Sequence, residues 1–426
     1  MSTFKIRSIK FNFLMNLLLT GSSLLFPLIT FPFVSRALLS GGYGLCNWAI
    51  SIASWLSLIA MLGVNRYGIR EVARVRDDAA ELQRVTREIL QMTLITTAIV
   101  LVCFVVSLFL VPKLAENRTL LLINGVTILC NTLGVGWFFQ GIEQYSYITV
   151  RGVLIKLVCF IGVVALVHVP SDYLVYAVLV VASAALANLV NFFYMRHILA
   201  AAAAEGAAFS GKLQPLRHLR PMLTFFVIVA SISIYTVLDT TMLGFLSTDS
   251  QVGYYTAAIN LKNALQGVVS ALTGVLLPRA SNMLAKGEEE QFRAIIKKCL
   301  VVVLAVSIPC SVLLAVFGTP LISWYAGADF EAAGPVVSLV GFAVIPIGLS
   351  IVFCDAVMVP LGLERYCTYV YVSAAIIDFC GNLVLIPLLG ALGAAIATLS
   401  VELLIAIIEF VIIRKHIFVG AQQGGA

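Results

Sequence analysis

Residues 35–78 read SRALLSGGYGLCNWAISIASWLSLIAMLGVNRYGIREVARVRDD, and the chain contains this pattern twice. A glycine-rich turn is followed by one long apolar run and then by a basic amphipathic tail. A shift of 209 residues places Gly44 on Gly253, where the second copy opens with VGYYTAAINL. A further pair of similar segments, 141–145 and 362–366, is offset by 221 residues. Repeats spaced by half the chain are typical of duplicated membrane transporters.

The bulk composition indicates the class of protein. Of the 426 residues, 61% are hydrophobic and only 11% are charged, and the mean hydropathy is +1.04. A soluble core cannot bury so much apolar surface, so we expect an integral membrane protein. Because the apolar runs are long and unbroken, the spans are predicted to be helices rather than barrel strands. The nine cysteines show no CxxC or zinc spacing and are interpreted as packing residues.

The predicted fold class is an all-α polytopic membrane protein with about 12 transmembrane helices in two six-helix bundles. Residues 1–197 are the predicted N-terminal bundle, 198–220 a cytoplasmic connector and 221–426 the C-terminal bundle. Since each bundle has an even number of helices, a pseudo-two-fold axis along the membrane normal is expected. The apolar runs lie near residues 11–33, 42–64, 87–111, 119–139, 148–168, 173–195, 221–246, 254–277, 299–317, 334–357, 368–388 and 391–413.

The lysines and arginines predict the orientation of the chain in the membrane. With a cytoplasmic N-terminus, 22 of the 27 lie in cytoplasmic segments, and only Arg36, Lys113 and Arg118 lie on the opposite side. Lys156 and Lys262 fall within spans. This excess predicts that both termini are cytoplasmic. The net charge of +6 is therefore explained by topology, and nucleic acid is not an expected partner.

Charged residues within the apolar runs are candidate functional residues, because each costs several kcal/mol in lipid unless it faces water or a partner. Asp239 and Lys262 are each expected ~10–12 Å below the outer face, so they could pair across adjacent helices. Such a pair would either fix helix packing or belong to a substrate or coupling site. Lys156 is expected too deep for its ammonium group to reach the interface fully, which favours a position facing a cavity.

Carboxylates are expected near the middle of the last two spans. Asp378 and Asn382 share a helix face, as do Glu402 and Glu409 one heptad apart. A proton-coupled transporter needs a titrating carboxylate at this depth, but a neutral acid bonded to a neighbour fits equally well. Asp239, Asp378 and Glu402 are therefore candidate coupling-ion residues.

Several arginines form a candidate anion site. Arg66 and Arg70 share one helix face at the inner end of the second span, and Arg279 is the repeat-mate of Arg70. Guanidinium groups bind phosphate bidentately, so these residues suit a phosphate-bearing substrate. Membrane topology alone would also explain each of the three. It does not explain Arg36, which lies on the side that carries few basic residues.

Motifs of catalysis and of nucleotide binding are absent from the sequence. It contains no GxxxxGK[ST] loop, HExxH motif, CxxC pair or nucleophile elbow, and its four histidines form no metal-ligand pattern. We therefore predict that the chain is not an enzyme and has no cofactor and no metal.

The chain resembles the polysaccharide repeat-unit flippases, the Wzx or O-antigen transporter family, within the superfamily of multidrug, oligosaccharidyl-lipid and polysaccharide exporters. The resemblance covers the first eight spans closely and extends more loosely to the end. One departure is Leu39-Ser40, where a glycine would be expected sooner. The matching segments are Ser35-Arg36, Gly42-Tyr43-Gly44, Leu62-Gly63, residues 65–71 (NRYGIRE), 136–143 (GWFFQGIE), 238–244 (LDTTMLG), 252–258 (VGYYTAA) and Leu277-Pro278-Arg279.

The resemblance implies a bacterial inner-membrane protein that moves an undecaprenyl-pyrophosphate-linked oligosaccharide from the cytoplasmic to the periplasmic leaflet by alternating access. It also implies two six-helix bundles around a cationic cavity. Proton or sodium antiport through the candidate carboxylates is a hypothesis, and other membrane proteins of polysaccharide assembly are candidate partners. The implied substrate-binding cations are Arg36, Arg66, Arg70, Lys156, Lys262 and Arg279.

Two other functions stay open from sequence. A drug or cation antiporter of the same fold would favour acidic cavity residues, whereas the first half of the chain has no acid deep in a span. A membrane enzyme of polysaccharide assembly would need a large outer loop with catalytic groups. The longest outer segment, about residues 318–333, holds only Asp329 and Glu331 as acids.

Overall fold

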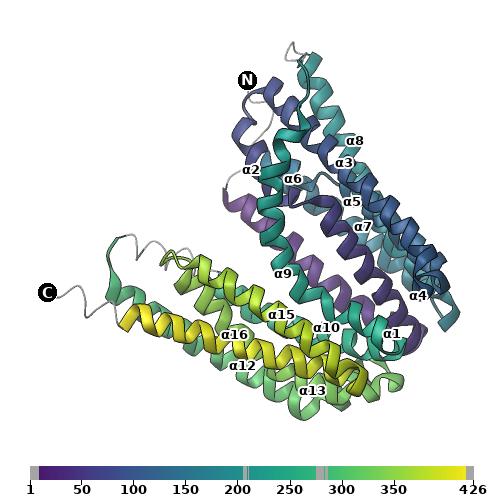
Figure 1. The fold of residues 1–426 in the computed structure, drawn as a ribbon, viewed down its shortest axis with the longest axis vertical. Coiled ribbons are helices and arrows are strands. Elements are labelled where there is room, and N and C mark those ends of the chain that lie inside the picture. Colours follow the sequence, from purple (N-terminus) through teal and green to yellow (C-terminus); the bar gives the residue numbers. More distant parts are fainter. Residues whose placement is uncertain (1–8, 205–208, 210, 275–282, 284–285, 419–426) are drawn as a thin grey trace. The chain divides into compact units, whose positions relative to one another are not determined.

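The structure is a computed structural model that describes residues 9–204, 209, 211–274, 283 and 286–418. Every regular element in this part of the chain is helical, which confirms the predicted all-α fold (Figure 1). In the first half the elements are α1 Ile9–Met61, α2 Val64–Val75, α3 Ala79–Leu110, α4 Pro112–Glu116, α5 Arg118–Leu133, α6 Gly136–Gly141, α7 Tyr145–Leu166, η1 Pro170–Asp172 and α8 Tyr173–Ala204. In the second half they are η2 Pro215–His218, α9 Leu219–Leu246, α10 Asp249–Gly274, α12 Glu289–Ala326, η3 Ala328–Ala333, α13 Gly334–Phe342, α14 Val344–Ile351, η4 Val352–Met358, α15 Glu364–Leu389 and α16 Ala391–Phe418.

The helices coincide with the predicted apolar runs. Nine segments of the described chain are long and apolar enough to cross a membrane, and one of them contains the first two runs as two helical parts of α1 that meet at a kink. α9 and α10 cover two further runs, and the run near 334–357 is divided among α13, α14 and the π-helical turn η4. Large apolar side chains are widely exposed, as lipid-facing helices require.

α1 bends sharply where the sequence departs from the family pattern. Leu39 has φ 58° and ψ −179°, a backbone conformation that glycine adopts readily and a leucine does not. The next backbone N–H, that of Ser40, donates a hydrogen bond of 2.6 Å to Asp329 Oδ2. The kink therefore interrupts the helical conformation at the boundary between the first two predicted spans.

Packing divides the chain into two units. Unit 1 comprises Met1–Leu38 and Trp48–Ala230, and unit 2 comprises Leu39–Asn47 and Ser231–Ala426. The predicted domain division at residues 197 and 221 stays a prediction.

In unit 1, α8 packs against α5 and α7, and α2 packs against α3 and α6. The buried core combines three aromatic residues of α6, Trp137, Phe138 and Phe139, with aliphatic side chains from α2 and α3. Phe139 stacks on Tyr194 at 5.6 Å between ring centroids, and Trp137 is so close to Gly68 that a Cβ there would lie 2.6 Å from the indole. This core fixes the turn between α5 and α7.

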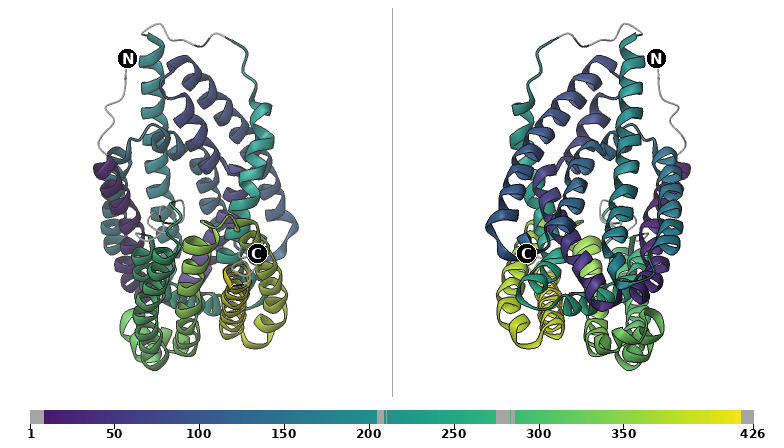
Figure 2. Two further views of the ribbon diagram at one scale, coloured as in Figure 1. Left: turned by 90° about the vertical axis from the view of Figure 1, so that its left-hand side faces the viewer. Right: turned by 90° about the vertical axis from the view of Figure 1, so that its right-hand side faces the viewer.

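In unit 2, α15 packs along α16 and α12 packs along α13, as two views of the green-to-yellow helices show (Figure 2). The repeated glycines meet here. A Cβ on Gly44 would lie 1.8 Å from the carbonyl oxygen of Asp249, and a Cβ on Gly253 would lie 2.2 Å from that of Ser40. The backbones of α1 and α10 therefore touch directly.

Candidate functional site

A cluster of polar side chains lies buried among the helices of unit 2. We call it the Asp239 cluster; it consists of Asp239 on α9, Tyr255 on α10, Asp378 and Asn382 on α15, and Thr398 on α16. Asp239 is 6% exposed and Asn382 is fully buried. Four helices thus direct polar groups to one point in an otherwise apolar interior.

Asp239 is the acceptor at the centre of this cluster. Its Oδ2 accepts hydrogen bonds from the hydroxyls of Tyr255 and Thr398, the latter at 2.9 Å. Its Oδ1 accepts a bond of 2.7 Å from Asn382 Nδ2, which also lies 3.1 Å from Asp378 Oδ2. Asp378 Oδ1 is buried and has no hydrogen-bond partner. Two carboxyl groups share one amide, an arrangement suited to holding a single proton or cation between them.

Lys262 is also buried, at 8% exposure on α10. Within the described residues, however, no ion pair closer than 4.0 Å forms between Lys262 and an acid. The pairing of Lys262 with Asp239 that the sequence suggested is therefore not a direct salt bridge. The donors that satisfy Asp239 are neutral groups.

The candidate acid Glu402 is buried on α16, one helical turn after Thr398. Glu409 lies two turns further and is fully buried. Its carboxylate, with Cys354 and Cys367, forms a group whose ligand atoms all lie within 4.8 Å of one another. Sequence spacing had suggested only packing roles for these cysteines, because the two thiols come from η4 and α15 and meet only in the folded chain.

The candidate cations of unit 1 are spread over several elements. Arg36 on α1 and Arg66 on α2 are exposed. Arg70 pairs with Glu71 at 2.8 Å and lies over the ring of Phe225, 5.1 Å from its centroid. Lys156 on α7 is half-buried and donates hydrogen bonds to Ser22 and Ser23 of α1. Arg279 lies outside the described residues.

A second buried polar network was not predicted. Glu88 on α3 is fully buried and accepts hydrogen bonds or ion pairs from Arg217 at 2.6 Å, His218 at 2.9 Å and the Gln214 backbone at 2.8 Å. The Tyr67 hydroxyl lies 2.6 Å from His218 Nδ1. Burial lowers the pKa of His218, so its neutral form is favoured, and its two ring nitrogens contact Glu88 and Tyr67. This network fastens the residues before α9 to α2 and α3.

The described residues of unit 1 surround at least two hollows. One, of about 400 Å³, is lined by polar groups that include Asn12, Asn16, Gln140 and Glu143. Glu143 pairs with Arg76 at 2.6 Å, and this hydrogen bond raises the pKa of Arg76.

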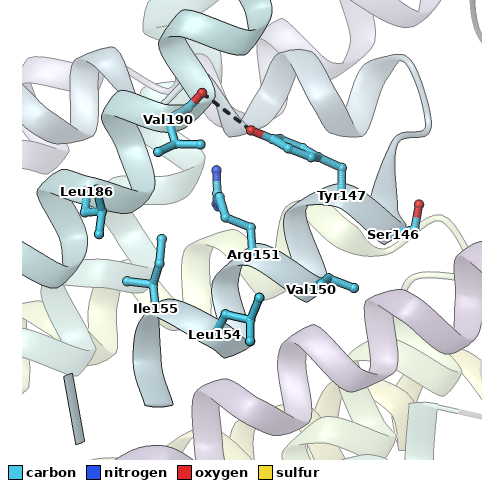
Figure 3. A pocket seen from close by; sticks show the side chains of 8 residues that line it. All are labelled: Ser146, Tyr147, Val150, Arg151, Leu154, Ile155, Leu186 and Val190. Atoms are coloured by element: carbon cyan, nitrogen blue, oxygen red, sulfur yellow. Dashed lines mark hydrogen bonds between the residues drawn. The ribbon is translucent and has the colours of Figure 1, made fainter. Parts of the chain in front are cut away.

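The other hollow, of about 610 Å³, lies between α7 and α8 (Figure 3). Apart from Ser146, Tyr147 and Arg151 its walls are aliphatic. Its lining residues are Ser146, Tyr147, Val150, Arg151, Leu154, Ile155, Leu186 and Val190.

Comparison with known proteins relates the chain to proteins of polysaccharide biosynthesis and O-antigen transport. A family model described as "Polysaccharide biosynthesis protein" matches residues 9–284. A relative from Escherichia coli (strain K12), named "Putative O-antigen transporter", is 23% identical over 401 residues, covering 93% of this chain and 94% of the relative. A relative of the same name from Shigella dysenteriae is 25% identical over 398 residues, covering 93% and 98%.

Solved structures share the fold. A structure of the lipid II flippase MurJ in an inward closed conformation matches with a TM-score of 0.72 and 14% identity, over 94% of this chain and 87% of that one. An inward-facing multidrug resistance MATE family transporter of the MOP superfamily matches with a TM-score of 0.65 and 14% identity, over 95% and 96%. At this identity the likeness concerns the fold alone.

Proposed function

Because the chain belongs to the polysaccharide biosynthesis protein family, we propose that it is a flippase for undecaprenyl-pyrophosphate-linked oligosaccharide repeat units. It moves them from the cytoplasmic to the periplasmic leaflet of a bacterial inner membrane by alternating access. The observation that carries this proposal is the similarity, over 93% of the chain, to two relatives named as O-antigen transporters. The family and these relatives indicate a transporter rather than an enzyme.

The pyrophosphate group of this substrate needs cations. We assign its binding to the residues selected from the sequence: Arg36, Arg66, Arg70, Lys156, Lys262 and Arg279. Arg66 is exposed on α2, which supports this role, because an exposed arginine is accessible to a phosphate in bidentate geometry. Arg70 already has a carboxylate partner in Glu71, so it would have to exchange that partner for the substrate.

The sugar moiety needs a polar surface, and the hollow beside Asn12 and Asn16 offers one. Its amides and the Glu143 carboxylate provide both donors and acceptors for hydroxyl groups. Asn12 Nδ2 donates a hydrogen bond of 3.3 Å to Glu143 Oε2, so these two polar groups lie side by side at the hollow. This hollow is a candidate docking site for the first sugars.

The coupling step is assigned to the Asp239 cluster, with Glu402 as a further candidate. Asp239 and Asp378 share the Asn382 amide in a buried site, where two negative charges side by side are unfavourable in free energy. Binding of one proton or sodium ion would therefore stabilise the cluster. The ion would be released when the cluster becomes accessible to the opposite side.

Deletion of the gene in its host tests the function. We expect the surface polysaccharide to be lost and undecaprenyl-linked repeat units to accumulate on the cytoplasmic side, where their sugars name the substrate. Unchanged polysaccharide together with altered sensitivity to cationic dyes would contradict the proposal and favour a drug antiporter.

Complementation with single variants tests the site. Arg36→Gln should restore polysaccharide poorly. Arg118→Gln is the matched control, because Arg118 is predicted on the same side and lies over the Phe109 ring without belonging to the candidate site. Equal complementation by both variants would remove Arg36 from the site.

A further inference from the structure

The hollow between α7 and α8 has walls suited to a hydrocarbon chain. Val150, Leu154 and Leu186 line it, and their exposed fractions are 56%, 57% and 51%. In a multi-pass membrane protein, exposed aliphatic side chains of spanning helices face lipid. We call this hollow the α7–α8 groove; with about 610 Å³ it offers space for part of one chain.

One cation occupies the polar end of the α7–α8 groove. Figure 3 shows the Arg151 side chain rising between α7 and α8, beside Tyr147 and Val190. Its Nη1 donates to Asn191 Oδ1, and its guanidinium carbon lies 5.6 Å from the centroid of the Tyr147 ring. Arg151 Nε is buried and has no hydrogen-bond partner. Its known partners are therefore a neutral amide and an aromatic ring.

The charge of Arg151 is not compensated by an acid. Among the ion pairs of the described residues, none includes Arg151. Arg151 lies six residues after the first residue of α7, or about 9 Å along the helix, and close to the start of the apolar run predicted near 148–168. A half-buried guanidinium with a buried, unpaired N–H strongly favours an anionic oxygen acceptor.

We propose that the α7–α8 groove binds one acidic glycerophospholipid of the surrounding bilayer. The phosphodiester accepts hydrogen bonds from Arg151 Nε and Nη, and one acyl chain lies along Val150, Leu154 and Leu186. Because an acidic lipid has no cationic head group to offset its phosphate, its net negative charge compensates Arg151 better than a zwitterionic lipid does. Basic pockets between spanning helices are a general form of site for lipid headgroups. A phosphodiester carries one negative charge and matches one arginine, whereas a diphosphate would bring excess charge to a groove with a single cation.

This site is independent of the flippase function proposed above. A lipid bound there would order α7 against α8 and would not be transported. Failure of either proposal therefore leaves the other intact.

Native mass spectrometry of the purified full-length protein tests the site, with phosphatidylglycerol and phosphatidylcholine as probes. We expect the wild type to bind one phosphatidylglycerol molecule more tightly than phosphatidylcholine. Arg151→Gln should weaken phosphatidylglycerol binding by about tenfold or more, which is the usual effect of losing a charge-assisted hydrogen bond. Arg151→Lys should retain part of the affinity.

Arg196→Gln is the matched control. Arg196 lies on α8 five residues after Asn191, is exposed, and contacts the ring of Phe192 outside the groove. This variant should bind phosphatidylglycerol as the wild type does. Leu186→Trp supplies a second test that leaves Arg151 in place, because the indole would fill the groove and lower the affinity for the lipid.

Three results would overturn the proposal. The first is equal binding of phosphatidylglycerol and phosphatidylcholine, and the second is an Arg151→Gln variant that loses no more affinity than Arg196→Gln. The third is displacement of phosphatidylglycerol by equimolar undecaprenyl diphosphate in the wild type, which would assign the groove to the diphosphate lipid.

Discussion

Asp239 depends on single hydrogen bonds from three different helices, so one donor can be removed at a time. Thr398→Val keeps the size of the side chain and removes the 2.9 Å bond to Asp239 Oδ2. We expect the variant to lose about 1–3 kcal/mol of stability, because a buried acceptor is left with fewer partners. Thermal unfolding of the detergent-purified protein measures this.

Thr256→Val is the matched control for that measurement. Thr256 lies on α10 and bonds only to the carbonyl of Val252 in its own helix. If Thr398→Val were no more destabilising than Thr256→Val, the Asp239 cluster would contribute little to the packing of α16.

His218 should make stability depend on pH. Burial lowers its pKa below the ordinary value of about 6.5, so the unfolded chain binds the proton more readily than the folded chain. The contribution of His218 is therefore complete above that value and is lost as pH falls through the folded-state pKa. The melting temperature of the wild type should fall between pH 8 and about pH 5, and this fall should be smaller for His218→Gln.

His197→Gln is the control for the pH series, because His197 is exposed on α8. It should behave as the wild type does. A wild-type melting temperature that does not change below neutral pH would contradict the assignment of a neutral buried His218.

The sequence predicted some residues of the Asp239 cluster and missed others for a physical reason. Asp239, Asp378 and Asn382 were visible because polar groups in an apolar run are rare. Tyr255 and Thr398 are ordinary in spanning helices, and Thr398 is 159 residues from Asp239 along the chain. Only the packing of α9, α10, α15 and α16 brings these side chains together.

At the scale of elements, the bend of α1 at Leu39 offers a stabilising substitution. Leu39→Gly removes the strain of a left-handed φ, which costs roughly 1–3 kcal/mol for a side-chain-bearing residue. Part of this gain is offset by the greater backbone freedom of glycine when unfolded. We expect a net gain of about 1 kcal/mol, measured by thermal unfolding.

Leu25→Gly is the control, because Leu25 is exposed within the regular part of α1. It should be destabilising by about 0.5–1 kcal/mol. If both glycine variants were destabilised alike, Leu39 would carry no strain.

The apolar runs predicted where the spanning helices are, but not how they begin, merge and bend. Long aliphatic stretches specify helices in lipid whatever their detailed order. The kink was not predictable, because Leu39 is no signal for a left-handed conformation. At the kink the backbone N–H of Ser40 donates a hydrogen bond to Asp329, which lies 289 residues away along the chain.

At the scale of the whole molecule, the proposed coupling predicts dependence on an ion gradient. Delivery of repeat units to the periplasmic leaflet should fall several-fold when the proton or sodium gradient is collapsed. Asp239→Asn should transport weakly and without response to the gradient, since it can no longer exchange a proton or bind a cation. Labelling of the exposed oligosaccharide in membrane vesicles measures this.

Wild-type transport that ignores both gradients would rule out the coupling while leaving the flippase function standing. Asp249→Asn serves as the control for Asp239→Asn, because it removes the same negative charge from the first turn of α10, outside the Asp239 cluster.

The contact between the repeated glycines has a consequence for the descent of the chain. Gly44 faces Asp249, and Gly253, its counterpart in the second repeat, faces Ser40, the counterpart of Asp249. Such a reciprocal contact is what two identical chains form across a two-fold axis. In an ancestor of half this length that paired with its own copy, the same glycine would have allowed the close backbone approach in both copies of the contact. Once the two copies were joined, either glycine could change without the other. Both positions nevertheless still exclude a side chain, because an added Cβ would lie only 1.8 Å or 2.2 Å from the facing carbonyl oxygen.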